Sequence, residues 1–148
     1  MARSQSTSQR QTGAPISIRL SRATDQVVAA EARRTQRSKS AVVSAFTEET
    51  ARTRRFPGIG FRGDDAARRA WVIGTGLDVW EIAQMCEDFG GPDSLVAETH
   101  LAERQVRLAL AYRDAYPDEV GDAIADNRRS AAELETLYPF IRPASGRP

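Results

Sequence analysis

Residues 15–21 read PISIRLS, and this stretch decides how the N-terminal part of the chain folds. Its three large apolar side chains alternate with Ser17 and Arg19, and a period of two over such a run is typical of a half-buried strand. Ser21 is a suitable N-cap, and apolar residues then recur at i, i+4 and i+7, which predicts a helix to about Arg34. A strand followed directly by a helix is therefore expected.

A second helix is expected after a short break, with Ser38 as its N-cap and Arg52 close to its end. Its apolar stripe is formed by Val42, Val43 and Phe46. One short strand and two short helices, about forty residues together, cannot bury a core alone. They must pair with a second copy of the chain or pack on something else.

The charge of the chain is unevenly distributed, although the net charge is only +1. Residues 1–55 hold eleven basic and four acidic residues, whereas residues 56–148 hold ten and sixteen, so the two parts carry +7 and −6. Twenty of the twenty-one basic residues are arginine beside 23 alanines, a bias typical of GC-rich coding, so arginine abundance alone is a weak indicator of nucleic-acid binding. The separation of charge indicates that the basic half binds anions and that the acidic half has a different function.

The second half of the sequence predicts a short β-hairpin followed by helices. The expected elements are strands over 59–62 and 70–73, a helix capped by Asp78, a short helix from Pro92 to about Thr99, a helix over 102–115, another that begins at Pro117, and a last short one capped by Ser130. The fold class expected for the whole chain is therefore mainly α.

Three features that can belong to enzyme sites favour a structural role in this sequence. Gly58, Gly60 and Gly63 have the spacing of the dinucleotide-binding fingerprint, but no buried strand precedes them and a charged hairpin follows. His100 has no second histidine to work with, and Cys86 falls on the apolar face of its expected helix. We expect no enzyme and no cofactor, and a nucleotide-dependent enzyme stays only as the third alternative.

Composition excludes several other classes of protein. One cysteine and one histidine rule out an intramolecular disulfide and are too few for an ordinary Cys/His zinc site. No apolar run approaches the ~20 residues of a membrane helix, and the basic N-terminus lacks the apolar stretch of a signal peptide. A cytoplasmic protein without a membrane partner is expected.

The strand expected at 16–21 suggests a way to bind DNA. If its apolar residues face a core, Ser17 and Arg19 stand together on the opposite face, and two such strands form a ribbon narrow enough for the major groove. Ser38, Lys39 and Ser40 at a helix N-terminus offer backbone N–H groups and a cation to phosphate. The alternative is an edge strand whose polar side chains are merely solvated.

Residues 15–53 resemble the ribbon-helix-helix DNA-binding domain, through the stretch ISIRLS, the helix after it and the stretch RSKSAVV at 37–43. This resemblance implies a homodimer formed through the strand. It also implies base contacts from Ser17 and Arg19, and phosphate contacts from Ser38, Lys39 and Ser40 with operator DNA.

Residues 56–121 resemble a small helix-turn-helix-like family found in antitoxins that are often encoded beside PIN-domain ribonucleases. The matching stretches are Gly74-Thr75, VWEI at 79–82 and LAERQVRLALAY at 101–112. A ribbon-helix-helix domain followed by such a domain resembles a VapB-type antitoxin. The resemblance implies a partner toxin, a PIN-type ribonuclease, whose active site is a cluster of carboxylates that holds a divalent metal.

The C-terminal segment, residues 128–148, is expected to contact that toxin. It is apolar and interrupted by proline after its short helix, and arginine pairs with two carboxylate oxygens at once. Arg142 is the first choice for the arginine that enters the carboxylate cluster, and Arg128 and Arg129 are the second. The apolar contacts are expected from Tyr138, Phe140 and Ile141. The alternative is that the segment packs back on residues 102–116.

The sequence thus predicts four parts: a disordered arm (1–14), a ribbon-helix-helix domain (15–54), a helix-turn-helix-like domain with a short β-hairpin (56–127) and a toxin-contacting tail (128–148). The leading functional hypothesis is an antitoxin of a type II toxin–antitoxin system that also represses its own operon. The alternative is a ribbon-helix-helix transcription regulator without a toxin partner.

Overall fold

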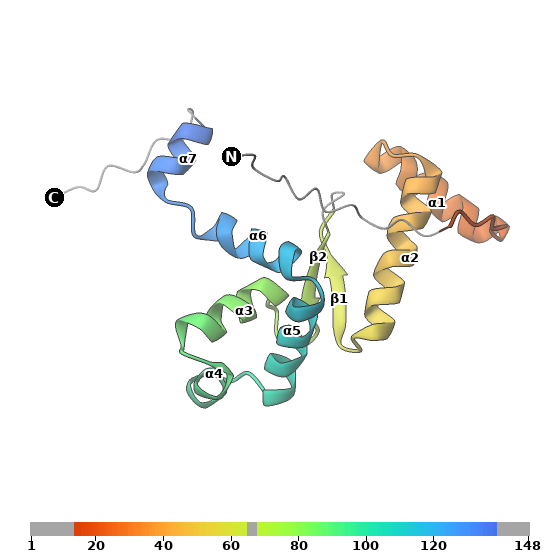
Figure 1. Ribbon diagram of the computed structural model, residues 1–148. Helices are drawn as coiled ribbons and strands as arrows, with labels where there is room; N and C mark the ends of the chain where they lie inside the picture. The colour runs from red at the N-terminus through yellow and green to blue at the C-terminus, as the bar shows by residue number, and fades with distance from the viewer. Residues whose placement is uncertain (1–13, 65–67, 139–148) are drawn as a thin grey trace, which may run out of the picture. The chain divides into compact units, whose positions relative to one another are not determined.

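The computed structural model describes residues 14–64 and 68–138 of the chain (Figure 1). Within these ranges it contains seven helices and one two-stranded antiparallel sheet, which confirms the mainly α class expected from the sequence. None of the helices in the described ranges is both long enough and apolar enough to cross a membrane. The arm expected at 1–14 lies outside these ranges except for its last residue.

The chain divides into two compact units, residues 1–42 and 43–148. The division falls inside helix α2 (Lys39–Arg55), so that this one helix contributes its first residues to one unit and the rest to the other. The domain boundary expected from the sequence, at 54–56, lies at the C-terminal end of the same helix. It stays a prediction.

In the first unit, helix α1 (Arg22–Thr35) begins as expected at Ser21, whose hydroxyl accepts a hydrogen bond from the backbone N–H of Thr24. The helix ends at Gln36, which adopts the left-handed conformation with φ 53°, and α2 starts after Ser38. These boundaries confirm both helices that the capping residues predicted. Val28 of α1 and Val42 of α2 are buried.

The strand predicted at 16–21 is not formed in the single chain. Residues 14–21 have neither helical nor strand structure, and Ile16 and Ile18 are 81% and 54% exposed rather than half-buried. The physical reason is that a strand exists only when a second strand accepts its backbone hydrogen bonds. The strand was expected to form by pairing with a second copy of the chain, and that pairing stays a prediction.

In the second unit, strands β1 (Ile59–Arg62) and β2 (Arg69–Val72) form the expected hairpin, with β2 one residue earlier than predicted. Ile59 and Val72 are opposite each other and both are fully buried, so this face of the hairpin covers the core. On the other face Gly60 lies opposite Trp71, and a Cβ at Gly60 would lie only 2.8 Å from the indole nitrogen. The close approach of Trp71 thus gives a packing reason for glycine at this position of the strand.

The core of the second unit lies between this hairpin and the helices that follow it (Figure 1). Its helices are α3 (Val79–Asp88), α4 (Pro92–Glu98), α5 (Glu103–Ala115), α6 (Pro117–Asn127) and α7 (Ala131–Leu137), all close to their predicted positions. Helix α3 packs against α4, α5 and α6, and Ile82 of α3 is fully buried in this core together with Val106 and Tyr112 of α5. Strand β2 of the hairpin and helix α6 both contact α3.

Candidate nucleic-acid interface and partner surfaces

The residues predicted to read DNA bases lie on the surface of the first unit. Ser17 and Arg19 are exposed in the segment that precedes α1, and so are the apolar residues that alternate with them up to Ile18. Apolar and polar residues alternate in this segment, but in the single chain neither set forms a buried face. A second strand would have to supply that face.

The residues predicted to hold phosphate gather at the start of α2. The Ser38 hydroxyl accepts from the backbone N–H of Ala41 at 3.1 Å, and Ser38, Lys39 and Ser40 are all exposed. Lys39 Nζ forms an ion pair with Asp25 of α1 at 2.8 Å, in which both side chains are about half exposed. An exposed pair of this kind contributes only about 0–1 kcal/mol, so the ammonium group can exchange the carboxylate for a phosphate at little cost.

A second cluster, which the sequence analysis did not find, fixes the C-terminal half of α2 to the helical core of the second unit. Arg52 Nη1 donates to the hydroxyl of Tyr112 at 2.9 Å and to Glu119 Oε2 at 2.6 Å, and the Tyr112 hydroxyl donates to Glu119 Oε1 at 3.0 Å. The Arg52 guanidinium also lies 4.1 Å from the centre of the Tyr116 ring. Arg52 and Glu119 are 67 residues apart, so no local spacing in the sequence signals this contact.

The surroundings of Tyr112 in this Arg52 cluster raise the pKa of its hydroxyl. Burial raises the pKa of the Tyr112 hydroxyl far above its ordinary value, and the charge of Glu119 acts in the same direction. The hydrogen bond from Arg52 opposes this change, although it does not outweigh burial. Tyr112 therefore stays protonated in the folded chain under conditions in which an exposed tyrosine ionises.

Asp78 is the centre of another cluster, at the start of α3. Its side chain is only 5% exposed, and its two oxygens accept hydrogen bonds from Arg62 Nε at 2.6 Å and Arg69 Nε at 3.0 Å. The indole N–H of Trp80 donates to the same carboxylate at 3.3 Å. Both strands of the hairpin are thereby tied to the N-terminus of α3.

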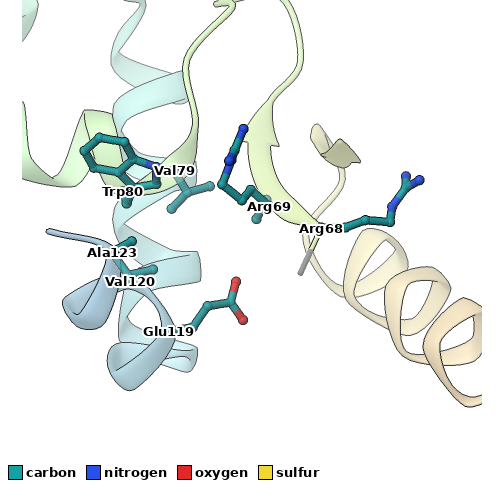
Figure 2. Close-up of a pocket in the computed structure, with 8 residues that line it drawn as sticks. Arg68, Arg69, Val79, Trp80, Glu119, Val120 and Ala123 are labelled. Atoms are coloured by element: carbon teal, nitrogen blue, oxygen red, sulfur yellow. The ribbon is translucent and has the colours of Figure 1, made fainter. Parts of the chain in front are cut away.

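A pocket of about 320 Å³ lies beside this cluster, between the hairpin, the start of α3 and α6 (Figure 2). We call it the Trp80 pocket. Its lining is apolar except for three charged residues, Arg68, Arg69 and Glu119. The remaining lining residues are Ala70, Val79, Trp80, Val120 and Ala123.

The residues predicted to contact a toxin are only partly described. Arg128 forms ion pairs with Glu87 and Asp88 at 3.0 and 3.1 Å, and Arg129 forms one with Asp126, all at exposed positions. Tyr138 follows α7 and is 43% exposed. Phe140, Ile141 and Arg142 lie outside the described residues.

The residues considered for enzyme chemistry lie at different places in the second unit. His100 is exposed between α4 and α5, and Cys86 is buried, which raises the pKa of its thiol. Gly63 follows β1, and the next element in the described ranges is strand β2 rather than the helix that a pyrophosphate site requires. Within the described ranges, no group of three or more His, Cys, Asp or Glu side chains is arranged to hold a metal ion.

Comparison with protein-family models, with curated proteins and with solved structures finds no match to this chain. The functional assignment therefore depends on the residues and contacts of the chain itself. Three surfaces of the described residues are candidates for binding a partner. They are the segment 14–21 together with the start of α2, the Trp80 pocket, and the region of α7.

The raised pKa of Tyr112 makes the stability of the chain pH-dependent at alkaline pH. The unfolded chain loses this proton near pH 10 whereas the folded chain keeps it, so the unfolded state binds fewer protons and the free energy of unfolding falls as the pH rises. We expect Tyr112→Phe to show a smaller fall between about pH 9 and 11, measured by urea unfolding.

Tyr116→Phe is the matched control, because it removes a hydroxyl of the same type that does not hydrogen-bond Arg52 or Glu119. It is expected to keep the steeper wild-type decrease. Equal slopes for wild type and Tyr112→Phe would contradict the prediction.

Proposed function

We propose that the chain is an antitoxin of a type II toxin–antitoxin system, which represses its own operon as a DNA-binding homodimer and neutralises a partner toxin by direct binding. The observation that carries this proposal is the exposed segment 14–21, with its alternating apolar and polar residues, next to two capped helices. The side chains of Ile16 and Ile18 are exposed to solvent, as expected for one strand of a DNA-binding ribbon whose second strand is absent. The exposed residues Ser38, Lys39 and Ser40 follow at the start of α2.

The case for a homodimer comes from apolar exposure in the first unit. Ile16, Ile18 and Val27 are 81%, 54% and 59% exposed, although isoleucine and valine are among the residues most often buried. Pairing of two copies through the segment would cover these side chains and give its backbone N–H and C=O groups their partners. With a two-fold axis between the two copies, the backbone groups and apolar side chains of both chains find the same partners.

The case for DNA binding comes from the polar residues of the same segment. In a paired ribbon, Ser17 and Arg19 of both copies would share one face, and arginine can donate to both major-groove acceptors of guanine. Lys39 and the start of α2 would contact the phosphates beside the ribbon. The first turn of α2 contains no acidic residue, which favours an anion there.

The case for a partner toxin comes from the acidic second unit and from the resemblance to antitoxins. Residues 56–148 carry a net charge of −6, which suits a protein partner rather than nucleic acid. A PIN-type ribonuclease presents a cluster of carboxylates, into which Arg142, Arg128 or Arg129 would donate. The ion pairs of Arg128 and Arg129 are exposed and weak, so they can be exchanged for the toxin.

One observation favours the alternative, a ribbon-helix-helix regulator without a toxin. Arg128 and Arg129 already have acidic partners within their own unit, so neither needs a toxin to pair its charge. The two functions share the dimer and the DNA contacts. They differ only in the need for a protein partner.

The proposed dimer predicts a specific effect of proline in the ribbon. Ile18→Pro removes a backbone N–H donor from the middle of the paired strands, so we expect the chain to sediment as a monomer. Ala14→Pro is the matched control, because Ala14 is also exposed but precedes the ribbon, and it should remain a dimer. A dimer of wild-type stability for Ile18→Pro would place the interface elsewhere.

The proposed DNA contacts predict different effects for two cations. Arg19→Ala should weaken binding to the operator upstream of the gene by roughly 1–3 kcal/mol and change binding to random DNA little, because a base contact is lost. Lys39→Ala should weaken both about equally and reduce the salt dependence, because a phosphate contact carries no sequence information. Fluorescence anisotropy at several salt concentrations measures both effects.

Arg107→Ala is the control for this experiment, since Arg107 is an exposed arginine on α5 that pairs with Glu103 and takes no part in the proposed interface. It should bind both DNAs like wild type. Equal losses on operator and random DNA for Arg19→Ala would rule out base reading by this residue.

The antitoxin function itself is tested with the protein encoded by the adjacent reading frame. We expect the wild-type chain to co-purify with that protein and to restore growth when the two are co-expressed. A chain truncated after Asn127 should keep its melting temperature and operator binding but fail to restore growth, because it lacks all the proposed toxin-contacting arginines and apolar residues. If the wild-type chain binds DNA but neither captures nor neutralises that protein, the alternative function is correct.

A further inference from the structure

We infer that the Trp80 pocket is the main docking site for the partner protein, and that it receives an apolar side chain from a segment with a carboxylate on one side and a cation on the other. This inference rests on the proposed function and gives it a second contact, separate from the C-terminal segment.

The floor of the Trp80 pocket has the properties of a site for an apolar side chain. Ala70, Val79 and Val120 form part of it and are almost completely buried, while Trp80 and Ala123 are half-buried. The volume of about 320 Å³ lies at the lower end of the range of small ligand pockets. A partly exposed tryptophan beside such a floor is the type of residue on which binding energy concentrates in protein interfaces.

The charges at the rim of the pocket indicate which charged groups the partner segment carries on either side of its apolar side chain. Arg69 lies on the hairpin side and Glu119 lies opposite, on α6, while Arg68, also on the hairpin side, pairs with Glu49 at 2.9 Å (Figure 2). A segment that crosses the pocket would therefore find a cation at one end and an anion at the other. This arrangement complements a peptide with opposite charges around an apolar residue, and it opposes a nucleic acid, whose charge is negative throughout.

The side chains of Arg69 and Glu119 are already held in place before a partner arrives. Asp78 accepts from Arg69 Nε at 3.0 Å, and the Arg69 side chain is still 62% exposed, so its terminal N–H groups remain accessible. Arg52 and Tyr112 hold the Glu119 carboxylate at 2.6 and 3.0 Å. Side chains positioned in advance lose little conformational freedom on binding, which favours affinity.

Ala123→Leu tests the pocket without changing its charge. Ala123 is half-buried on α6 and lines the pocket, so a leucine there fills the space and keeps a good helix-forming residue. We expect its affinity for the protein from the adjacent reading frame to fall at least about tenfold, measured by calorimetry. Binding to operator DNA should not change.

Ala125→Leu is the matched control, because Ala125 is exposed on the same helix and does not line the pocket. Its affinity for the partner should stay within about twofold of wild type. The chain truncated after Asn127 provides a second comparison: it keeps the pocket, so it should still bind the partner, and Ala123→Leu should weaken that binding as well.

A measurement on the unaltered pocket covers the case in which Ala123→Leu disturbs folding. The chain has two tryptophans, so Trp71→Phe labelled with 5-fluorotryptophan gives a single fluorine NMR signal from Trp80. Addition of the partner protein should shift this signal. A signal that stays unchanged while the partner binds would overturn the inference.

The outcomes separate the inference from the proposed function. If wild type binds the partner and Ala123→Leu binds it equally well, the docking site is wrong and the antitoxin function stands. If wild type does not bind the partner, both fail together. A change in the sedimentation of Ala123→Leu without a change in partner affinity would assign the pocket to a second copy of the chain and would also overturn the inference.

Discussion

The second unit depends on the carboxylate of Asp78. Among the described residues, Asp78 is the one charged residue that is buried, and its carboxylate receives hydrogen bonds from both strands of the hairpin and from the indole of Trp80. An ionised carboxylate can be buried only when it is paired and hydrogen-bonded, and here two guanidinium groups fulfil that condition. The backbone N–H of the same residue is held by Glu81 at 2.6 Å, so the hairpin and α3 meet at one point. The Trp80 pocket lies beside this point because the same contacts position Arg69 and Trp80.

The helices could be predicted closely from the sequence because their ends depend on local chemistry. Ser21 and Ser130 cap helices through their own hydroxyl groups, and Pro92 and Pro117 occupy the first positions of α4 and α6. Each of these signals involves residues within one turn of the chain. The second strand of the hairpin was placed one residue late, since its register depends on the pairing of Ile59 with Val72.

What the sequence could not predict depends on residues far apart in the chain. The Arg52 cluster joins residues 52, 112 and 119, and the Trp80 pocket combines the hairpin, α3 and α6. The segment 14–21 is different, because the strand predicted there would need a second strand to pair with, and the single chain offers none among its described residues. The residues predicted to contact DNA are all exposed, while their function stays a proposal: Ser17, Arg19, Ser38, Lys39 and Ser40.

Helix α2 belongs to both compact units, and this gives its two ends different local stabilities. Its C-terminal half is fixed by the Arg52 cluster, whereas in the described part of the first unit only Val28 and Val42 are buried. Regions with few buried apolar contacts open first, at a small fraction of the free energy of global unfolding. In an unpaired chain, amide protection should therefore decrease along α2 toward Lys39. The same gradient would direct a cellular protease to the N-terminal unit first, so that the lifetime of this unit in the cell depends on whether it is paired.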